Sequence, residues 1–405
     1  MTTRMLGSIG ALAALAIVST LVVVPVSGQG SPAPPALVVT AFGGQTAPAY
    51  KMPRTPWGDP DLQGAWSSDD MSNVPMSRPA QFGERLYLNE TEFTQRMNQI
   101  KRGVSQSENE ADSTFRFDFA RRAFRQASLV VDPPNGVMPM VTPAAQKRQM
   151  PRGTFGNGPL DWTTDFSLYE RCITRGIAGS VLRVIYGNGN RIVQGPGVVA
   201  ITYEMVHDTR MFYIDNRPHV GSPIREYLGD SRARWDGDEL VGETTNLTDQ
   251  TAIGVNGNGP RHSTQMKITE RFKRVADDIL QYQMTIDDPV TYARPYTISM
   301  PLTPLDGGRV LPYECHEGNY AILQALGAER AEDKALAEDL AKGIKRERRA
   351  VQDGAGIGAA PTPAPSCTER RSRLRPFARS AATALSSARS APSDSEMAVL
   401  PGWHS

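Results

Sequence analysis

The chain is poor in cysteine and histidine and carries almost no net charge. Its 405 residues include three Cys and five His, and 44 Lys and Arg balance 43 Asp and Glu. This balance excludes the strongly basic surface that is typical of nucleic-acid-binding domains, so no nucleic-acid partner is predicted. The cysteines form no CxxC pair and no Cys/His spacing typical of zinc, so the sequence does not indicate a structural metal site.

Common catalytic signatures are also missing. The sequence contains no GxSxG, no HExxH, no P-loop and no GxGxxG before a helix. These motifs mark many hydrolases, metalloproteases, NTPases and dinucleotide-binding enzymes. No cofactor is therefore predicted, and the sequence leaves enzymatic activity uncertain.

The N-terminus has the pattern of an export signal. Arg4 precedes a run of apolar and small residues from Met5 to Val24, and Gly28 lies just beyond it. The pattern predicts a secretory signal peptide over residues 1–28, and a periplasmic or secreted protein with no membrane span after its removal. The alternative is an uncleaved anchor, because about 20 apolar residues can cross a bilayer.

Apolar and polar residues alternate in segment after segment between Val198 and Met300. One face of a predicted strand is formed by Leu280, Tyr282, Met284 and Ile286. The Asp-Gly pair at Asp236 and Gly237 supplies the positive φ that a tight hairpin needs. Strands of about 5–8 residues at this spacing predict a mainly β fold, either an antiparallel barrel or a sandwich.

Composition divides the rest of the chain. Residues 29–56 are rich in Ala and Pro, which is typical of a linker, and the β-rich domain is expected over residues 57–326. A capping Asn and helical spacing of apolar residues predict a helix near residues 90–102. A charged helix is predicted over residues 327–351. Residues 352–405 lack periodicity and are predicted to be disordered.

Several short runs carry a resemblance to other proteins. They are Glu170–Gly176 (ERCITRG), Gly229–Asp238 (GDSRARWDGD), Glu270–Phe272 (ERF) and Cys315–Tyr320 (CHEGNY). In combination they resemble a group of exported bacterial proteins that is usually carried as uncharacterised. The resemblance implies an exported β-rich protein and carries over no catalytic residue. In addition, Gly64-Ala65-Trp66 resembles the GxW element that opens the first strand of lipocalin-like barrels.

Two of the three cysteines lie inside the predicted domain. Cys172 and Cys315 are expected to form a disulfide, since an oxidising compartment permits one. Closing so long a loop stabilises a fold by about 4–5 kcal/mol in the chain-entropy model. The alternative is two separate buried thiols, because periodicity does not show which residues are close together. Cys367 lies in the predicted tail.

A carboxylate falls on the apolar face of a predicted strand. Glu270 is in phase with Ile268 and Phe272, and a buried charge needs a partner, a proton or a solvated cavity. One alternative is an ion pair with an arginine such as Arg191 or Arg294. If Glu270 is instead protonated or solvated by an internal cavity, it belongs to a ligand pocket or acts as a general acid or base with a raised pKa.

Three histidines could share that chemistry with Glu270. His207 continues an apolar strand face, His262 precedes the strand of Glu270, and His316 follows Cys315. For each histidine the alternative is a hydrogen-bonded imidazole in the core or at a turn. A metal site formed by these histidines with Glu270 or Glu317 has no support from local spacing.

Loop residues near the hairpin are candidates for ligand binding. The expected binding residues are Arg217, His219, Asp230, Arg232 and Trp235. They lie in or beside a Gly- and Pro-containing loop, where binding groups concentrate. The alternative for the loop is a turn whose polar side chains bond the backbone.

Two functional hypotheses follow. The first is an exported protein that binds a small organic ligand in a partly apolar cavity. The second is an enzyme, such as a lyase, isomerase or hydrolase, in which Glu270 and a histidine divide the base and acid roles in the same cavity. The oligomeric state is not predicted.

Overall fold

Most of the described chain belongs to one large sheet. The computed structural model describes residues 35–109, 120–148, 160–184, 186–254, 257, 259–311 and 313–345. The predicted signal peptide and the predicted tail lie outside the described residues. The strands are β1 (Gly64–Ser67), β2 (Val130–Asp132), β3 (Gly189–Gly195), β4 (Val198–Tyr203), β5 (Thr209–Tyr213), β6 (Asp230–Asp236), β7 (Glu239–Thr245), β8 (Lys267–Ala276), β9 (Ile279–Asp287) and β10 (Tyr296–Pro304).

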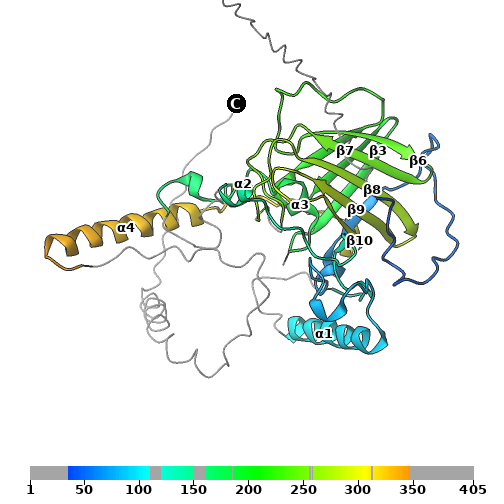
Figure 1. The fold of residues 1–405 in the computed structure, drawn as a ribbon, viewed down its shortest axis with the longest axis horizontal. Helices are drawn as coiled ribbons and strands as arrows, with labels where there is room; N and C mark the ends of the chain where they lie inside the picture. The colour runs from blue at the N-terminus through cyan, green and yellow to red at the C-terminus, as the bar shows by residue number, and fades with distance from the viewer. Residues whose placement is uncertain are drawn as a thin grey trace, which may run out of the picture.

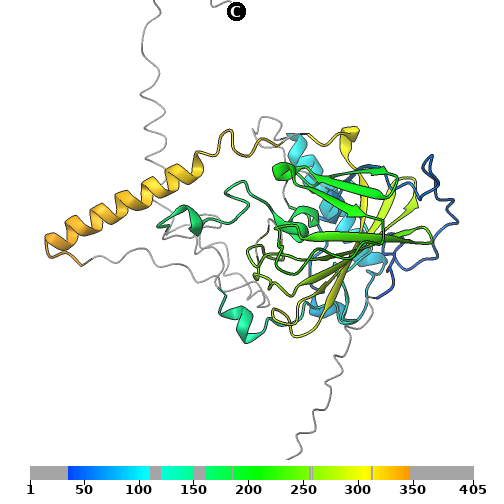
Figure 2. The same ribbon diagram turned by 90° about the horizontal axis from the view of Figure 1, so that it is seen from above.

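Nine of the ten strands close into a barrel (Figures 1 and 2). The order around the ring is β1-β3-β4-β5-β6-β7-β8-β9-β10, and the pairing of Trp66 with Pro304 joins β1 to β10. The short strand β2 pairs with the other end of the same edge of β10. The mainly β prediction is therefore confirmed, and of its two forms the barrel is the correct one.

The predicted alternation sets which side chains fill the barrel. Ile268 and Phe272 of β8 are buried, and they pair with Ile286 and Tyr282 of β9. These residues belong to one continuous apolar core with side chains from the other strands. The hairpin of β6 and β7 turns at Gly237, which has φ +61°, as the Asp-Gly pair predicted.

One pair of neighbouring strands breaks the antiparallel pattern. β5 and β6 are parallel and pair at only two positions, Phe212 with Ser231 and Tyr213 with Arg232. The crossover of residues 214–229 joins them, because parallel neighbours cannot be linked by a tight hairpin. The barrel is therefore mixed, and its wall is weakly paired at this one contact.

Part of the predicted linker packs against the barrel. The backbone N–H groups of Val38 and Thr40 donate to the side-chain carbonyls of Gln283 (2.8 Å) and Gln281 (3.0 Å) on β9. Both glutamines are fully buried as a result. The linker prediction is therefore wrong for this part of residues 29–56, because a backbone segment satisfies polar groups on the outer face of β9.

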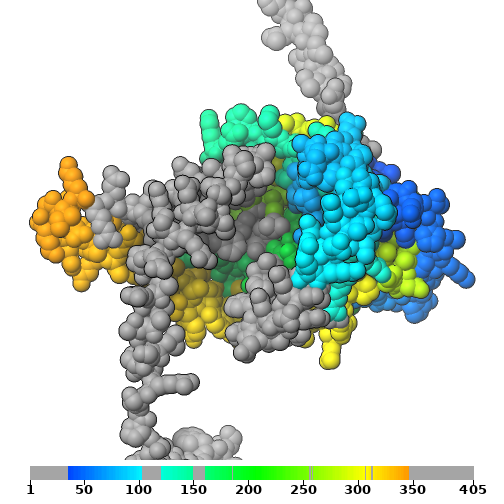
Figure 3. Space-filling view, turned by 90° about the horizontal axis from the view of Figure 1, so that it is seen from below, coloured from blue at the N-terminus to red at the C-terminus, as the bar shows by residue number. Residues whose placement is uncertain are grey.

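Four helices of the described chain accompany the barrel. They are α1 (Glu90–Asn109), α2 (Pro143–Gln146), α3 (Gly176–Val181) and α4 (Ala321–Ala341), with short 3₁₀ turns at Asp69–Met71, Ala80–Phe82, Thr163–Asp165, Met205–His207 and Asp306–Gly308. Of these helices, α3 is buried against the main core. In the space-filling view, α1 and its flanking residues (cyan) cover one side of the barrel (Figure 3). α4 projects away from the barrel in both ribbon views (Figures 1 and 2).

Both predicted helices exist, with different ends. Asn89 and Glu92 cap α1 reciprocally, at 2.9 and 2.8 Å, as expected. However, α1 continues past Gly103 to Asn109, because a single glycine weakens a helix by only about 1 kcal/mol and no proline follows. α4 begins and ends earlier than the predicted range 327–351.

Candidate functional site

Glu270 lies inside the barrel and is paired with an arginine. Its two carboxylate oxygens accept from the two terminal guanidinium nitrogens of Arg210 on β5, at 3.0 and 2.6 Å. The side chains are 0% and 1% exposed. The ion-pair alternative is therefore the correct one for Glu270, although the suggested partners were wrong. Arg191 is exposed on β3, and Arg294 lies 3.7 Å from Asp132.

Four hydroxyl groups complete this buried network. Tyr282 donates to Glu270 (2.8 Å), and Arg210 donates to the hydroxyls of Tyr203 (3.0 Å), Ser231 (3.2 Å) and Thr244 (2.9 Å). Burial lowers the pKa of Arg210, but the Glu270 carboxylate outweighs that effect and raises it overall. Burial and the same carboxylate raise the pKa of Tyr282. Arg210 therefore stays charged and its partners stay fixed.

The network holds structure in place and leaves Glu270 without a substrate-facing position. Apolar side chains surround the ion pair, including Phe212, whose ring lies 4.7 Å below the Arg210 guanidinium. Gly242, which pairs with Glu270, makes room for that ring, because a Cβ there would lie 2.4 Å from it. A proton transfer at Glu270 would first require the ion pair to break.

The three histidines do not join Glu270. The chain turns after β4, with positive φ at Val206 and His207, so His207 leaves the strand face and lies 3.9 Å from Glu314. His316 is exposed beside Cys315. His262 is buried away from the ion pair, in contact with Thr251 and Ser263. No hydrogen bond or ion pair links any of them to Glu270 within the residues that the structure describes.

His262 is buried as a neutral imidazole. Its Nδ1–H donates to the carbonyl of Ser263 (3.1 Å), so its Nε2 accepts from the hydroxyl of Thr251. Burial lowers the pKa of His262. Ser263 is held in turn by Asp288, whose carboxylate accepts from its hydroxyl at 2.7 Å.

This burial predicts a stability that falls in mild acid. The folded-state pKa of His262 lies below its unfolded value of about 6.5. Below that pH the unfolded chain therefore binds more protons at this residue than the native state does, and protonation favours unfolding. Urea unfolding at pH 7.5 and pH 5 should show a loss about 1 kcal/mol smaller for His262→Gln than for the native chain. Equal losses in the two proteins would contradict the prediction.

A cleft opens in the barrel wall where β5 and β6 separate. It has a volume of about 920 Å³ and lies between the start of β5, the start of β6 and the crossover of residues 214–229. Its lining is Asp208, Thr209, Arg210, Met211, Tyr213, Arg217, Val220, Arg225, Glu226, Tyr227, Leu228, Gly229, Asp230, Ser231, Arg232, Thr248 and Gln250. Because β5 and β6 pair at only two positions, the wall is open on the side where they diverge.

Three of the five predicted binding residues line this cleft. Arg217 and Arg232 each place a guanidinium 5.3 Å from the ring centroid of Tyr213. Arg232 is held by Asp230 at 2.9 and 3.1 Å, and Arg217 by Asp215 at 2.5 Å. Such contacts fix the planar head groups over an aromatic face.

The other two predicted residues do not line the cleft. His219 places Nδ1 2.7 Å from Asp230 and Nε2 3.5 Å from Glu243, so it connects the crossover to β6 and β7. Trp235 is half-buried on β6, packs against the core and does not line the cleft. His219 therefore positions the wall, and Trp235 belongs to the core packing near the hairpin of β6 and β7.

Sequence reasoning missed Tyr213, Arg225, Glu226 and Tyr227 of the cleft. The last three are consecutive and precede β6 by a few residues. A parallel crossover, recognised in advance, would have placed them beside β5, but no local pattern in the sequence indicates one.

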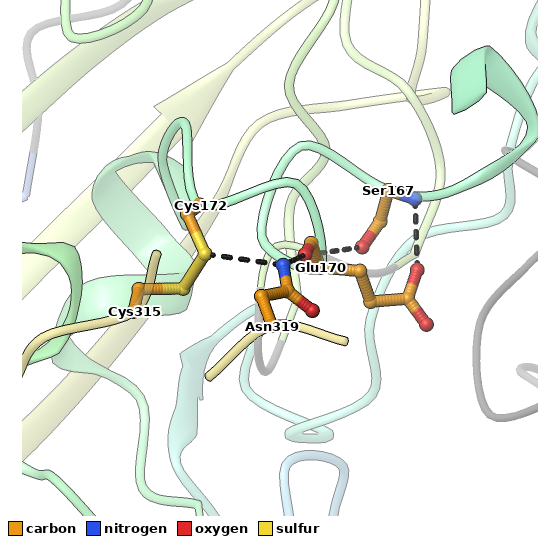
Figure 4. The surroundings of a disulfide bond; sticks show 5 residues. All are labelled: Ser167, Glu170, Cys172, Cys315 and Asn319. Atoms are coloured by element: carbon orange, nitrogen blue, oxygen red, sulfur yellow. Dashed lines mark hydrogen bonds between the residues drawn. A yellow bond between two sulfur atoms is a disulfide. The ribbon is translucent and has the colours of Figure 1, made fainter. Parts of the chain in front are cut away.

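The predicted disulfide is confirmed. Cys172 and Cys315 are bonded, with 5.5 Å between their Cα atoms (Figure 4). The side-chain amide of Asn319 donates to the Glu170 carbonyl (2.7 Å) and lies 3.3 Å from the Cys172 sulfur. The bond therefore fastens the segment before α4 to the turn that ends at Cys172.

The described ranges show neither a metal-binding cluster nor a helix that could span a membrane. They contain no group of three or more His, Cys, Asp and Glu side chains that could hold a metal ion. None of their helices is both long and apolar enough to cross a membrane. Comparisons with family models, with curated proteins and with solved structures found no match.

Proposed function

We propose that the protein is exported and binds a small organic molecule in the cleft between β5 and β6. The observation that carries the proposal is the opening of the barrel wall into a cleft of about 920 Å³. Small-molecule sites are typically about 300–1,000 Å³, with apolar walls and a few oriented polar groups. Here Met211, Val220 and Leu228 supply apolar surface beside the oriented arginines.

The same cleft favours binding over catalysis. Its arginine head groups are held by carboxylates or backbone carbonyls, which orients them before a ligand arrives. By contrast, the residues expected to carry acid and base chemistry are separated, with Glu270 inside the barrel and His207 and His316 at exposed positions. The leader pattern and the disulfide support an exported location.

The binding proposal predicts that filling the cleft abolishes ligand retention. The mature protein, incubated with periplasmic extract and analysed by native mass spectrometry, should carry a bound small molecule. Val220→Trp should reduce the retained fraction at least about tenfold, because the indole occupies the cleft and a tenfold change in affinity needs only about 1.4 kcal/mol.

Val193→Trp provides the matched control. Val193 is 41% exposed on β3 and lies outside the cleft, while Val220 is 36% exposed within it. The control should retain the ligand at the native level. Equal retention by Val220→Trp and Val193→Trp, or no bound molecule on the native chain, would refute the proposal.

A further inference from the structure

We infer that the molecule bound in the cleft is a zwitterion, with a carboxylate that binds Arg225, a protonated amine that binds Glu226 and an apolar body, as in an apolar amino acid. This inference rests on the proposed function, because it names the chemical class that the same cleft would take.

Arg225 differs from the other arginines of the cleft. Arg210, Arg217 and Arg232 each have a carboxylate partner. The Arg225 guanidinium has none among the described residues, and it donates instead to the backbone carbonyls of Leu247 (3.3 Å) and Thr264 (2.8 Å). Both bonds use one terminal nitrogen, so the other N–H groups of the fork remain available for a ligand carboxylate.

Glu226 differs in the same way from Asp208 and Asp230, the other acids of the cleft, because its carboxylate lacks a partner among the described residues. Asp230 is bound to Arg232 and His219, and Asp208 accepts from the Thr174 hydroxyl at 2.5 Å. The Glu226 carboxylate has no cation or hydrogen-bond donor as a partner anywhere in the described chain. Within the described residues of the cleft, Arg225 is therefore the arginine without a carboxylate partner, and Glu226 is the acid with neither a cation nor a hydrogen-bond donor. The two residues are consecutive in the chain.

The backbone fixes both residues in place. The N–H of Glu226 donates to the Asn246 carbonyl and its carbonyl accepts from the N–H of Thr248, both at 3.0 Å. The Asn246 side chain donates to the carbonyls of Val220 (3.2 Å), Gly221 (3.1 Å) and Ile224 (2.9 Å). Such anchoring means that little backbone entropy is lost when a ligand engages the two charges.

The remaining surface of the cleft suits an apolar body. The ring of Tyr213 lies under two guanidinium groups, and Tyr227, Met211 and Leu228 add apolar surface to a lining that also contains the polar side chains of Thr248 and Gln250. A ligand of net zero charge also suits a lining in which the other three arginines already have carboxylate partners, because it brings no uncompensated charge into the cleft.

Three probes of nearly equal size test the two charges separately. They are L-phenylalanine, 3-phenylpropanoate, which lacks the amine, and phenethylamine, which lacks the carboxylate. Isothermal titration of the mature full chain should give the tightest binding for L-phenylalanine and at least about tenfold weaker binding for the other two.

Single substitutions should separate the role of Arg225 from that of Glu226. Arg225→Gln should weaken L-phenylalanine about tenfold or more and leave phenethylamine unchanged. Glu226→Gln should weaken L-phenylalanine similarly and leave 3-phenylpropanoate unchanged. Arg191→Gln and Glu84→Gln, which neutralise exposed residues outside the cleft, should change none of the three affinities.

Two results would overturn the inference while leaving the proposed function intact. One is equal affinity of all three probes for the native chain, or no detectable binding of any of them, while Val220→Trp still releases the molecule captured from extract. The other is a captured molecule that lacks either a carboxylate or an amine. Failure of the proposed function itself would instead appear as retention that Val220→Trp does not change.

Discussion

Glu270→Gln should lower the free energy of unfolding by about 3–5 kcal/mol, because it leaves the buried Arg210 charge without its counter-ion. The amide keeps the shape of the carboxylate, so packing is preserved and the loss reports the charge. Glu270 also accepts from Tyr282, and an uncharged acceptor weakens that bond. Urea unfolding followed by circular dichroism at pH 7.5 measures the change.

Two further variants show whether the pair or the packing is responsible. Tyr282→Phe removes one hydroxyl from the network and should cost only about 1 kcal/mol. The double variant Arg210→Met with Glu270→Leu removes both charges and should be more stable than Glu270→Gln, since well-packed apolar replacements of a buried ion pair are often neutral or stabilising. A loss below about 1 kcal/mol for Glu270→Gln would mean that the charge of Arg210 is satisfied in some other way.

The sequence predicted half of this pair for a physical reason. Side chains alternate along a strand, so the phase of Glu270 with Ile268 and Phe272 placed the carboxylate inside. Arg210 has the same phase with Phe212 on β5, and that alternation was legible too. What could not be read is that β5 and β8 face each other across the closed barrel, because closure depends on strand order and not on any local pattern.

Local reasoning failed where the backbone leaves a regular strand. His207 was placed on the face of Val199 and Ile201, but the chain turns with positive φ at Val206 and at His207 itself. β-branched residues rarely adopt such angles, so the identity of Val206 argued against a turn there. The turn exists because β4 and β5 pair antiparallel through Thr202 and Thr209.

The cleft residues could also be predicted only in part from local sequence patterns. Arg217, Asp230 and Arg232 were selected because polar residues concentrate in loops between strands, and all three line the opening. Arg225 and Glu226 were passed over because nothing local separates them from solvated surface residues. Among the described residues, Arg225 has no carboxylate partner and Glu226 has no cation or hydrogen-bond donor for its carboxylate. Only the arrangement of β5 and β6 reveals that this pair lies beside a parallel crossover.

Removing the disulfide should destabilise the chain by about 5 kcal/mol in the chain-entropy model, because Cys172 and Cys315 are separated by 143 residues. Cys172→Ala with Cys315→Ala is the test variant, and urea unfolding against the native chain is the measurement. Thiol titration should find one free thiol in the unreduced, denatured chain, from Cys367, and three after reduction.

The structure also predicts which segment opens first when the disulfide is removed. α4 is held near the barrel by Leu326, which packs on Leu160 and Phe166 in a small cluster separate from the main core. Without the bond, hydrogen exchange should quicken over residues 313–341 and stay slow in β8 and β9, since local opening follows the regions with few buried contacts. Cys367→Ala should change neither exchange nor stability. If exchange instead quickens evenly over the barrel strands, the disulfide stabilises the barrel itself, and α4 is fastened by its apolar contacts alone.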